Sequence, residues 1–315
     1  MLNEYYQNVG LKGFFKRYGL VNALRRGAFT ANPLHRVPDY EMRKVLWQRK
    51  VSAKIASYLR YQDQEPQDIQ YSDRSPRDPV WIYWNSAIET APPVIRRCCQ
   101  AAVDFHGDRV IILSEENMPE YIRMPREIEE KRRSGVIPLA IYTDLMRVAL
   151  LAHYGGTWMD ATVYLTQPIA KEILASEFFV FRNSLGLLQN PALYPVWFIH
   201  AEKENPLICR IRNTLFAYWE RENHLLEYLT SNLIFTQVIG QDPRAEAAIP
   251  YMNSDYSEYL VRQLGKPYCA EEFNWICGLT GIHKLTYKLD PAIDRPGSVY
   301  HHILGSEGRE EEGTP

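Results

Sequence analysis

One segment, residues 142–162, constrains the fold of this chain more than any other, because it joins a short helix directly to a strand. Asp144 and Arg147 stand three residues apart, so both side chains lie on one face of the predicted helix. Leucine, valine and alanine residues form an apolar stripe on the other face. The Gly-Gly pair at 155–156 stands where helices commonly end in a left-handed conformation. We therefore expect a helix that stops at these glycines and is followed at once by a strand.

The predicted strand carries a carboxylate. Its residues alternate, so that Trp158, Asp160 and Thr162 share one face and the residues between them share the other. Asp144 and Arg147 on the helix and Asp160 on the strand are therefore expected to converge on one small volume. Such an arrangement of polar groups is typical of a binding site.

The wider pattern is that of an α/β protein. Apolar runs at residues 80–84, 109–113 and 178–181 read as strands, and stretches with helical features lie between them. This alternation predicts a mainly parallel sheet flanked by helices, with the ligand site at the carboxyl ends of the strands. We expect three parts: a helical extension and linker at 1–75, a catalytic domain at 76–305 and an acidic flexible tail at 306–315.

The first sixty residues are strongly basic. They hold twelve Lys and Arg against three acidic residues, a net charge of +9, whereas the whole chain carries −2. Basic and apolar residues interleave in residues 1–30, which suits a helix on an anionic membrane and equally suits a helix packed on the domain. Both alternatives stay open. We expect no nucleic-acid binding, because no groove-reading motif accompanies the charge.

The sequence also predicts where the protein resides. It has no run of 18 apolar residues, and its first ten residues lack the apolar core of a signal peptide. Five cysteines form neither a paired framework nor a C-x-x-C site, which favours reduced thiols. We expect a cytoplasmic protein, with contact at the inner face of the cytoplasmic membrane as an option.

The segment around the two glycines resembles a known family. Asp-x-x-Arg, Leu-Leu and Gly-Gly-x-Trp-x-Asp-x-Thr are similar to sugar-nucleotide glycosyltransferases with a DXD motif, and more closely to the capsular polysaccharide synthesis branch of glycosyltransferase family 32. The similarity extends from about Pro79 to Tyr287. It implies a GT-A, Rossmann-like fold. It also implies retaining transfer of a sugar, with a UDP-sugar as the expected donor, to a growing capsular or surface polysaccharide or a lipid-linked glycan.

Sugar transfer requires compensation of the charge that grows on the leaving diphosphate, which a cation held by carboxylates supplies. Asp160 is the expected ligand of Mn²⁺ or Mg²⁺. The family motif has a second Asp where this chain has Thr162, a poorer ligand. We therefore look to His302 and Ser306, in a run that resembles the C-terminal segment of related transferases. The alternatives are a structural carboxylate at Asp160 and a surface histidine pair near the end of the chain.

Other residues are expected to bind the donor. The resemblance implies that Asp144 and Arg147 contact sugar hydroxyls, which both donate and accept hydrogen bonds. The alternative is a solvated ion pair on a helix surface. His283 and Lys284 are expected either to contact phosphate or to lie on the surface.

The nucleobase is expected to stack on an aromatic side chain. Trp84 follows a strand that ends at the ligand edge, and we place Tyr83 beside it among the substrate-binding residues. Trp158 is expected to line or brace the pocket. The alternative is that Trp81 and Trp84 are simply core residues.

Two other functions are compatible with the sequence. A non-catalytic relative would bind a sugar nucleotide or glycan within a polysaccharide-assembly complex, and Thr162 in place of an acid is the argument for it. A metal-dependent enzyme acting on phosphoryl groups would need more clustered acids or histidines. Calorimetry with UDP plus Mn²⁺ followed by a turnover assay separates the non-catalytic relative from the transferase.

Overall fold

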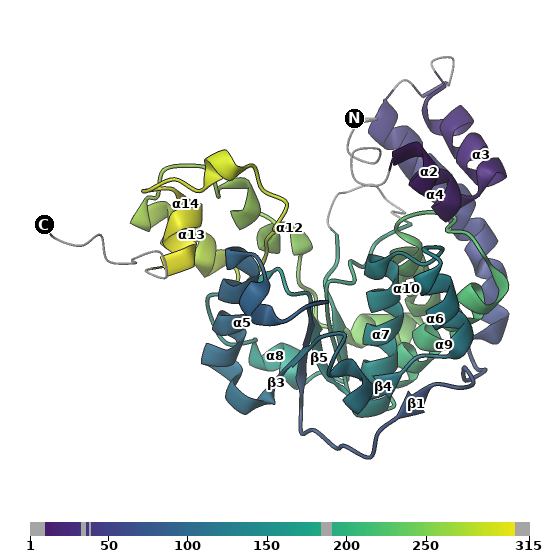
Figure 1. The fold of residues 1–315 in the computed structure, drawn as a ribbon, viewed down its shortest axis with the longest axis horizontal. Coiled ribbons are helices and arrows are strands. Elements are labelled where there is room, and N and C mark those ends of the chain that lie inside the picture. The colour runs from purple at the N-terminus through teal and green to yellow at the C-terminus, as the bar shows by residue number, and fades with distance from the viewer. Residues whose placement is uncertain (1–9, 33–35, 38, 184–190, 306–315) are drawn as a thin grey trace, which may run out of the picture.

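A five-stranded sheet lies at the centre of the computed structural model, which describes residues 10–32, 36–37, 39–183 and 191–305 (Figure 1). The strand order is β3-β2-β5-β8-β7. β2 is parallel to β3 and β5, whereas β8 is antiparallel to β5 and β7, so four strands share one direction. The predicted mainly parallel α/β sheet is therefore confirmed. The strands are β2 (Val80–Tyr83), β3 (Val110–Leu113), β5 (Gly156–Met159), β7 (Phe178–Val180) and β8 (Phe198–Ala201).

Alternation along the central strands divides the interior into two cores. Trp81 and Trp158 point to the core that α7, α9 and α10 cover, whereas Val80 and Met159 point to the core beneath α5. α13 and α14 lie on the same side as α5 (Figure 1). These helices are α5 (Pro93–His106), α7 (Leu139–Tyr154), α9 (Pro206–Arg221), α10 (Thr230–Ile239), α13 (Ala270–Leu279) and α14 (Val299–Leu304).

Two small sheets and seven further α-helices complete the strands and α-helices of the described residues. Two small sheets pair β1 (Gln70–Tyr71) with β4 (Ile122–Arg123), and β6 (Val163–Leu165) with β9 (Ile282–Lys284). The remaining α-helices are α2 (Gly10–Tyr18), α3 (Leu20–Thr30), α4 (Tyr40–Ile55), α6 (Arg126–Arg133), α8 (Lys171–Leu174), α11 (Pro243–Ala248) and α12 (Ser254–Ser257). None of the described helices is both long enough and apolar enough to cross a membrane.

α7 is the predicted helix, and it ends where the glycines predict. Gly155 caps it with φ 70°, and Gly156 follows with φ 96°. A Cβ on Gly156 would lie 2.2 Å from the carbonyl oxygen of Pro79, so the chain needs glycine there. The prediction of a single apolar stripe is too narrow. α7 is buried on nearly every side. The face of its two charged residues is covered as well, because Ser231 of α10 contacts Asp144, and Val196 and Asp160 contact Arg147.

The predicted strand through Thr162 is wrong in its second half. β5 ends at Met159, and Val163 donates its backbone N–H to the Asp160 carbonyl at 2.8 Å, which closes a turn. The chain then leaves the central sheet, and β6 pairs with β9 instead. Strand alternation therefore does not relate Asp160 to Thr162, which lie on a turn.

Two of the stretches with helical features divide into separate elements. Residues 122–133 form β4 followed by α6, and Pro125 stands directly before α6. The helix that begins at Pro206 ends at Arg221, because Glu222 adopts an extended conformation. α10 is then a separate helix.

The basic N-terminal helices pack onto the side of the molecule that holds α9 and α10 (Figure 1). Phe14, Tyr18 and Trp47 join the same core as α7. Arg26 forms a buried ion pair with Glu227 at 3.1 Å. Packing on the rest of the molecule therefore accounts for several apolar residues of this extension and for Arg26. The boundary at residue 75 stays a prediction. The predicted tail at 306–315 lies outside the described residues.

Candidate functional site

A cavity of about 570 Å³ lies at the carboxyl ends of β2 and β5. Trp84 directly follows β2 and Asp160 directly follows β5, and because the two strands are parallel, both residues reach the same edge of the sheet. Seven of the predicted site residues line this cavity: Tyr83, Trp84, Asp144, Arg147, Trp158, Asp160 and Thr162.

Asp144 and Arg147 form a buried ion pair at 3.0 Å. Their side chains are only 11% and 5% exposed, so the alternative of a solvated pair is wrong. Ser231 donates its hydroxyl to Asp144 Oδ2 at 2.6 Å. Burial raises the pKa of Asp144 above its usual value, although the Arg147 guanidinium acts in the opposite direction.

Arg147 connects the helix to the strand end. Its guanidinium lies 3.2 Å from Asp160 Oδ1, and it also donates to the carbonyl oxygen of Val196. It stands over the ring of Trp158, 5.0 Å from the ring centre, in a cation–π contact. Asp144, Arg147 and Asp160 therefore converge as the sequence predicts, and their roles in binding stay predictions.

Asp160 has a second cationic partner, Lys284, at the end of β9. Lys284 Nζ lies 2.8 Å from Asp160 Oδ2 and also donates to Thr162 Oγ1. The indole N–H of Trp158 donates to Asp160 Oδ1 at 3.1 Å. Burial acts to raise the pKa of Asp160, but Lys284 and Arg147 outweigh it, so that the pKa lies below its usual value.

These contacts leave a donor set that does not fit Mn²⁺ or Mg²⁺. Both oxygens of Asp160 face cations, and the Thr162 hydroxyl accepts from Lys284. Within the described residues, no three His, Cys, Asp or Glu side chains gather closely enough to hold an ion. A divalent ion prefers an octahedral or larger set of oxygen ligands. The metal therefore stays a prediction that these side chains do not support.

The predicted C-terminal ligands do not join the cavity wall. His302 stacks on Tyr268, with 3.7 Å between ring centres, and meets Phe273 edge-on at 5.0 Å. It is not among the described residues that line the cavity. Ser306 lies outside the described residues. His283 is fully buried and shares a 3.0 Å hydrogen bond with Thr166, so only Lys284 of the His-Lys pair faces the cavity.

Aromatic side chains form one rim of the cavity. Trp84 is half-buried and meets Tyr287 edge-on, with ring centres 5.3 Å apart. Tyr83 lines the cavity but donates its hydroxyl to Glu115. Trp81 is fully buried, so the alternative of a core tryptophan holds for Trp81 and not for Trp84. Sequence reasoning singled out neither Tyr287 nor Ser231, because their contacts join segments far apart in the chain.

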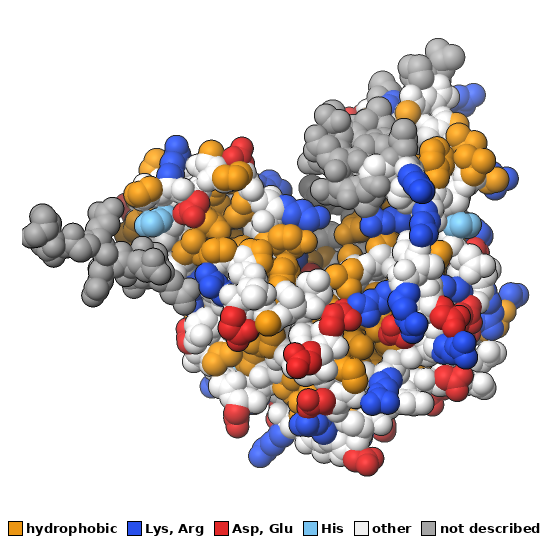
Figure 2. Space-filling view, in the orientation of Figure 1, with side chains coloured by type: hydrophobic (Ala, Val, Ile, Leu, Met, Phe, Trp, Pro, Cys, Tyr) orange, Lys and Arg blue, Asp and Glu red, His pale blue; other side chains and the backbone are white. Residues whose placement is uncertain are grey.

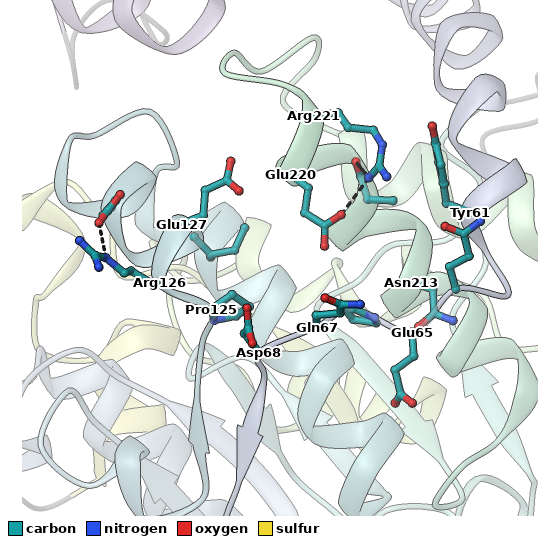
Figure 3. A pocket seen from close by; sticks show the side chains of 15 residues that line it. Tyr61, Glu65, Gln67, Asp68, Pro125, Arg126, Glu127, Asn213, Glu220 and Arg221 are labelled. Atoms are coloured by element: carbon teal, nitrogen blue, oxygen red, sulfur yellow. Dashed lines mark hydrogen bonds and ion pairs between the residues drawn. The ribbon is translucent and has the colours of Figure 1, made fainter.

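A second cavity, also of about 570 Å³, lies away from these residues between α6, α9 and the segment that follows η1 (Ala56–Tyr61) (Figure 3). Its two arginines are already paired with neighbouring acids: Arg126 with Glu130 and Arg221 with Glu220, both at 2.8 Å. None of the predicted site residues lines it. The first cavity is therefore the candidate functional site.

Comparison with known proteins identifies a family for this chain. A solved structure titled "PaToxG Glycosyltransferase" is 15% identical, with 65% of this chain and 84% of that chain covered and a TM-score of 0.38. None of the curated proteins matches. The family model described as capsular polysaccharide synthesis protein matches residues 31–303. Since that match spans most of its length, the chain belongs to the capsular polysaccharide synthesis protein family.

Proposed function

We propose that this protein is a glycosyltransferase that moves a sugar from a nucleotide donor, with UDP-sugars favoured, to a capsular or surface polysaccharide or a lipid-linked glycan. Membership of the capsular polysaccharide synthesis family supports this class of activity. The observation that carries the proposal is the buried network of Asp144, Arg147 and Asp160 on the wall of one cavity.

In this proposal Asp144 and Asp160 accept hydrogen bonds from the donor sugar. A carboxylate has about four acceptor positions, and Asp144 uses some of them for Ser231 and Arg147. Arg147 is engaged by both carboxylates, so its main task is to hold them at a fixed spacing. Groups held in place before the substrate arrives lose little entropy on binding, which favours affinity and reaction alike.

The aromatic rim suits the nucleobase. Trp84 and Tyr287 present ring surfaces at the edge of the cavity, and Tyr287 is 44% exposed. Base–aromatic stacking contributes about 1–3 kcal/mol. A base on Trp84 would place the diphosphate of the donor within the cavity, whose lining includes the half-buried Lys284 and the exposed Lys288.

Thermal stability with a panel of nucleotide sugars tests donor binding, because a ligand that binds only the folded state raises the melting temperature. We expect a UDP-sugar to raise it in the wild type and to have a much smaller effect in Asp144→Asn or Asp160→Asn. Asp108→Asn, an exposed residue outside the cavity, is the matched control. Failure of every nucleotide sugar to bind would refute the proposal.

Turnover separates an enzyme from its binding-only alternative. We expect slow hydrolysis of the preferred donor without acceptor, reduced about 100-fold or more in Asp160→Asn if the carboxylate acts in the transition state. Binding of the donor without hydrolysis or transfer would favour the non-catalytic relative. Retention of anomeric configuration, which the resemblance implies, is checked by NMR of the first product formed.

We further propose that α3 contacts an anionic membrane. Leu20, Val21 and Leu24 are 61%, 62% and 58% exposed, and Figure 2 shows hydrophobic side chains beside Lys and Arg at this end of the molecule. Residues 10–30 contain five Lys and Arg and no acidic residue. This combination suits the surface of an anionic bilayer, where apolar burial and charge attraction add.

The contacts of α3 link this surface to the cavity. The Asn22 side chain donates to the Leu225 carbonyl at 3.0 Å, three residues before Tyr228 on the cavity wall. A membrane at α3 would therefore bring a lipid-linked acceptor near the site. Vesicles containing anionic lipid should float the wild type but not a variant with serine at all three apolar positions. Trp275→Ser, which changes another exposed apolar residue, should float normally. Equal flotation of all three proteins would refute the membrane contact.

A further inference from the structure

Lys284 occupies the place where the resemblance puts a metal ion. It ends β9, directly across the β6–β9 pair from Val163, which follows the turn that carries Asp160 and Thr162. Its ammonium group lies 2.8 Å from Asp160 Oδ2 and hydrogen-bonds Thr162 Oγ1. These are the two residues at the DXD positions, so one side-chain cation contacts both.

The ammonium group keeps a hydrogen-bond donor for a ligand. A lysine has three N–H donors, and among the described residues Lys284 uses them for Asp160 and Thr162 only. Its side chain is 23% exposed and lines the cavity. One N–H is thus available to an anion that enters beside Asp160.

The charge of the cavity also favours an anion. The charged side chains among its described lining are Arg147, Lys284, Lys288, Asp144 and Asp160, three cations against two carboxylates, which gives a formal charge of +1. A pocket with an excess of one sign attracts ligands of the other. Positive charge is therefore present at the wall without an added ion.

We propose that Lys284 takes the role of the divalent cation, binding the diphosphate of the donor and offsetting the charge that grows on it. This rests on the proposed function. In the transfer, the bond from the anomeric carbon to the diphosphate oxygen breaks and its electron pair stays on that oxygen. The acceptor hydroxyl oxygen forms the new bond to the anomeric carbon, and its proton passes to the departing diphosphate. Lys284 stabilises the diphosphate by a charge-assisted hydrogen bond and keeps its own proton.

A purely structural role for Lys284 makes different predictions. If the ammonium group served only to pair Asp160 and join β6 to β9, its loss would lower stability and leave nucleotide affinity unchanged in the folded protein. The proposal instead predicts a loss of affinity for the diphosphate itself. Both stability and binding are therefore measured on the same variants.

The test is calorimetric binding of UDP and of inorganic pyrophosphate, in EDTA and then in Mn²⁺. We expect the wild type to bind UDP about equally well in both solutions. Lys284→Met, which keeps the length of the side chain but not its charge, should weaken UDP binding about tenfold or more. Lys284→Arg should recover part of that loss. Lys266→Met, at an exposed lysine outside the cavity, should behave as the wild type.

A second variant controls for misfolding of Lys284→Met. Lys284→Met removes one of the two cations beside Asp160, so the double variant Asp160→Asn, Lys284→Met restores the local charge balance. Its melting temperature should approach that of the wild type while its pyrophosphate affinity stays low.

The outcomes separate this inference from the proposed function. Binding of UDP that appears only with Mn²⁺, or stoichiometric binding of Mn²⁺ alone, overturns the role of Lys284 and leaves a glycosyltransferase standing. Unchanged UDP affinity in folded Lys284→Met overturns it as well. Absence of UDP binding by the wild type in both solutions overturns the inference together with the choice of a UDP-sugar.

Discussion

Removing the guanidinium of Arg147 should destabilise the protein because two carboxylates depend on it. Arg147→Met preserves most of the volume of the side chain while it removes the charge. Breaking a buried ion pair from one side costs about 3–5 kcal/mol, since the remaining charge is left without compensation. The loss of Arg147 affects the two carboxylates differently. Asp160 keeps Lys284 at 2.8 Å, whereas among the described residues Asp144 keeps only the Ser231 hydroxyl.

This asymmetry predicts which second substitution rescues the variant. Asp144→Asn in the Arg147→Met background removes the uncompensated charge and should recover at least half of the lost free energy of unfolding. Asp160→Asn in the same background should recover little, because Lys284 then loses its own partner. Interactions of this kind are non-additive, and a double-mutant cycle measures them directly.

Urea unfolding of the wild type, the single variants and the double variants at near-neutral pH provides the free energies. The difference between Arg147→Met and the wild type should narrow on acidification, because without Arg147 the pKa of Asp144 rises further and protonation removes its charge. Equal rescue by the two asparagine substitutions, or a cost under about 1 kcal/mol for Arg147→Met, would refute the buried network as the dominant interaction.

Three further predictions concern single positions. Gly156→Ala should unfold the protein or lower its free energy of unfolding by more than about 2 kcal/mol, because the added Cβ would lie 2.2 Å from a backbone oxygen. Gly297 also has a positive φ but has open space around it, so Gly297→Ala should cost only the backbone strain, about 1–2 kcal/mol in the same urea assay. Burial lowers the pKa of His200 to about 4, so the unfolded chain takes up a proton at this residue before the folded protein does as the pH falls below about 6.5. The free energy of unfolding should therefore drop by up to about 3 kcal/mol toward pH 4. His200→Asn should flatten this part of the curve of stability against pH. Ser231→Ala should lower the free energy of unfolding by about 1–3 kcal/mol, because it removes a hydrogen bond to a buried carboxylate. It should also weaken binding of a nucleotide sugar more than binding of the nucleotide alone. Calorimetry with both ligands checks this, and an equal loss of the two affinities would contradict it.

Features that depend on local sequence could be predicted. β2 is a short apolar run, and the end of α7 is encoded by two adjacent glycines, so both elements lie where expected. The convergence of Asp144, Arg147 and Asp160 follows from the same local information. A helix that stops sharply next to a strand leaves few ways to arrange three residues near the junction.

Features that depend on distant segments could not be predicted. The chain leaves the central sheet after Met159 because β6 pairs with β9, which lies more than a hundred residues later. The alternation of residues within 158–165 does not indicate that pairing. The burial of Arg147 was missed for the same reason. An amphipathic pattern indicates which face of a helix is more apolar, but contacts with Val196, Asp160 and Ser231 of α10 bury the charged face, and all three lie outside α7.

The contact between Asp160 and Lys284 also determines at what stage of synthesis the cavity wall can be complete. The two residues are 124 positions apart, so Asp160 leaves the ribosome well before Lys284 does. Domains generally fold as they emerge from the ribosome, and contacts between distant residues form slowly. A nascent chain that ends before β9 would carry Asp144, Arg147 and Asp160 but would lack Lys284, the second cation beside Asp160. The wall of the cavity is therefore complete only after β9 has been synthesised and has paired with β6.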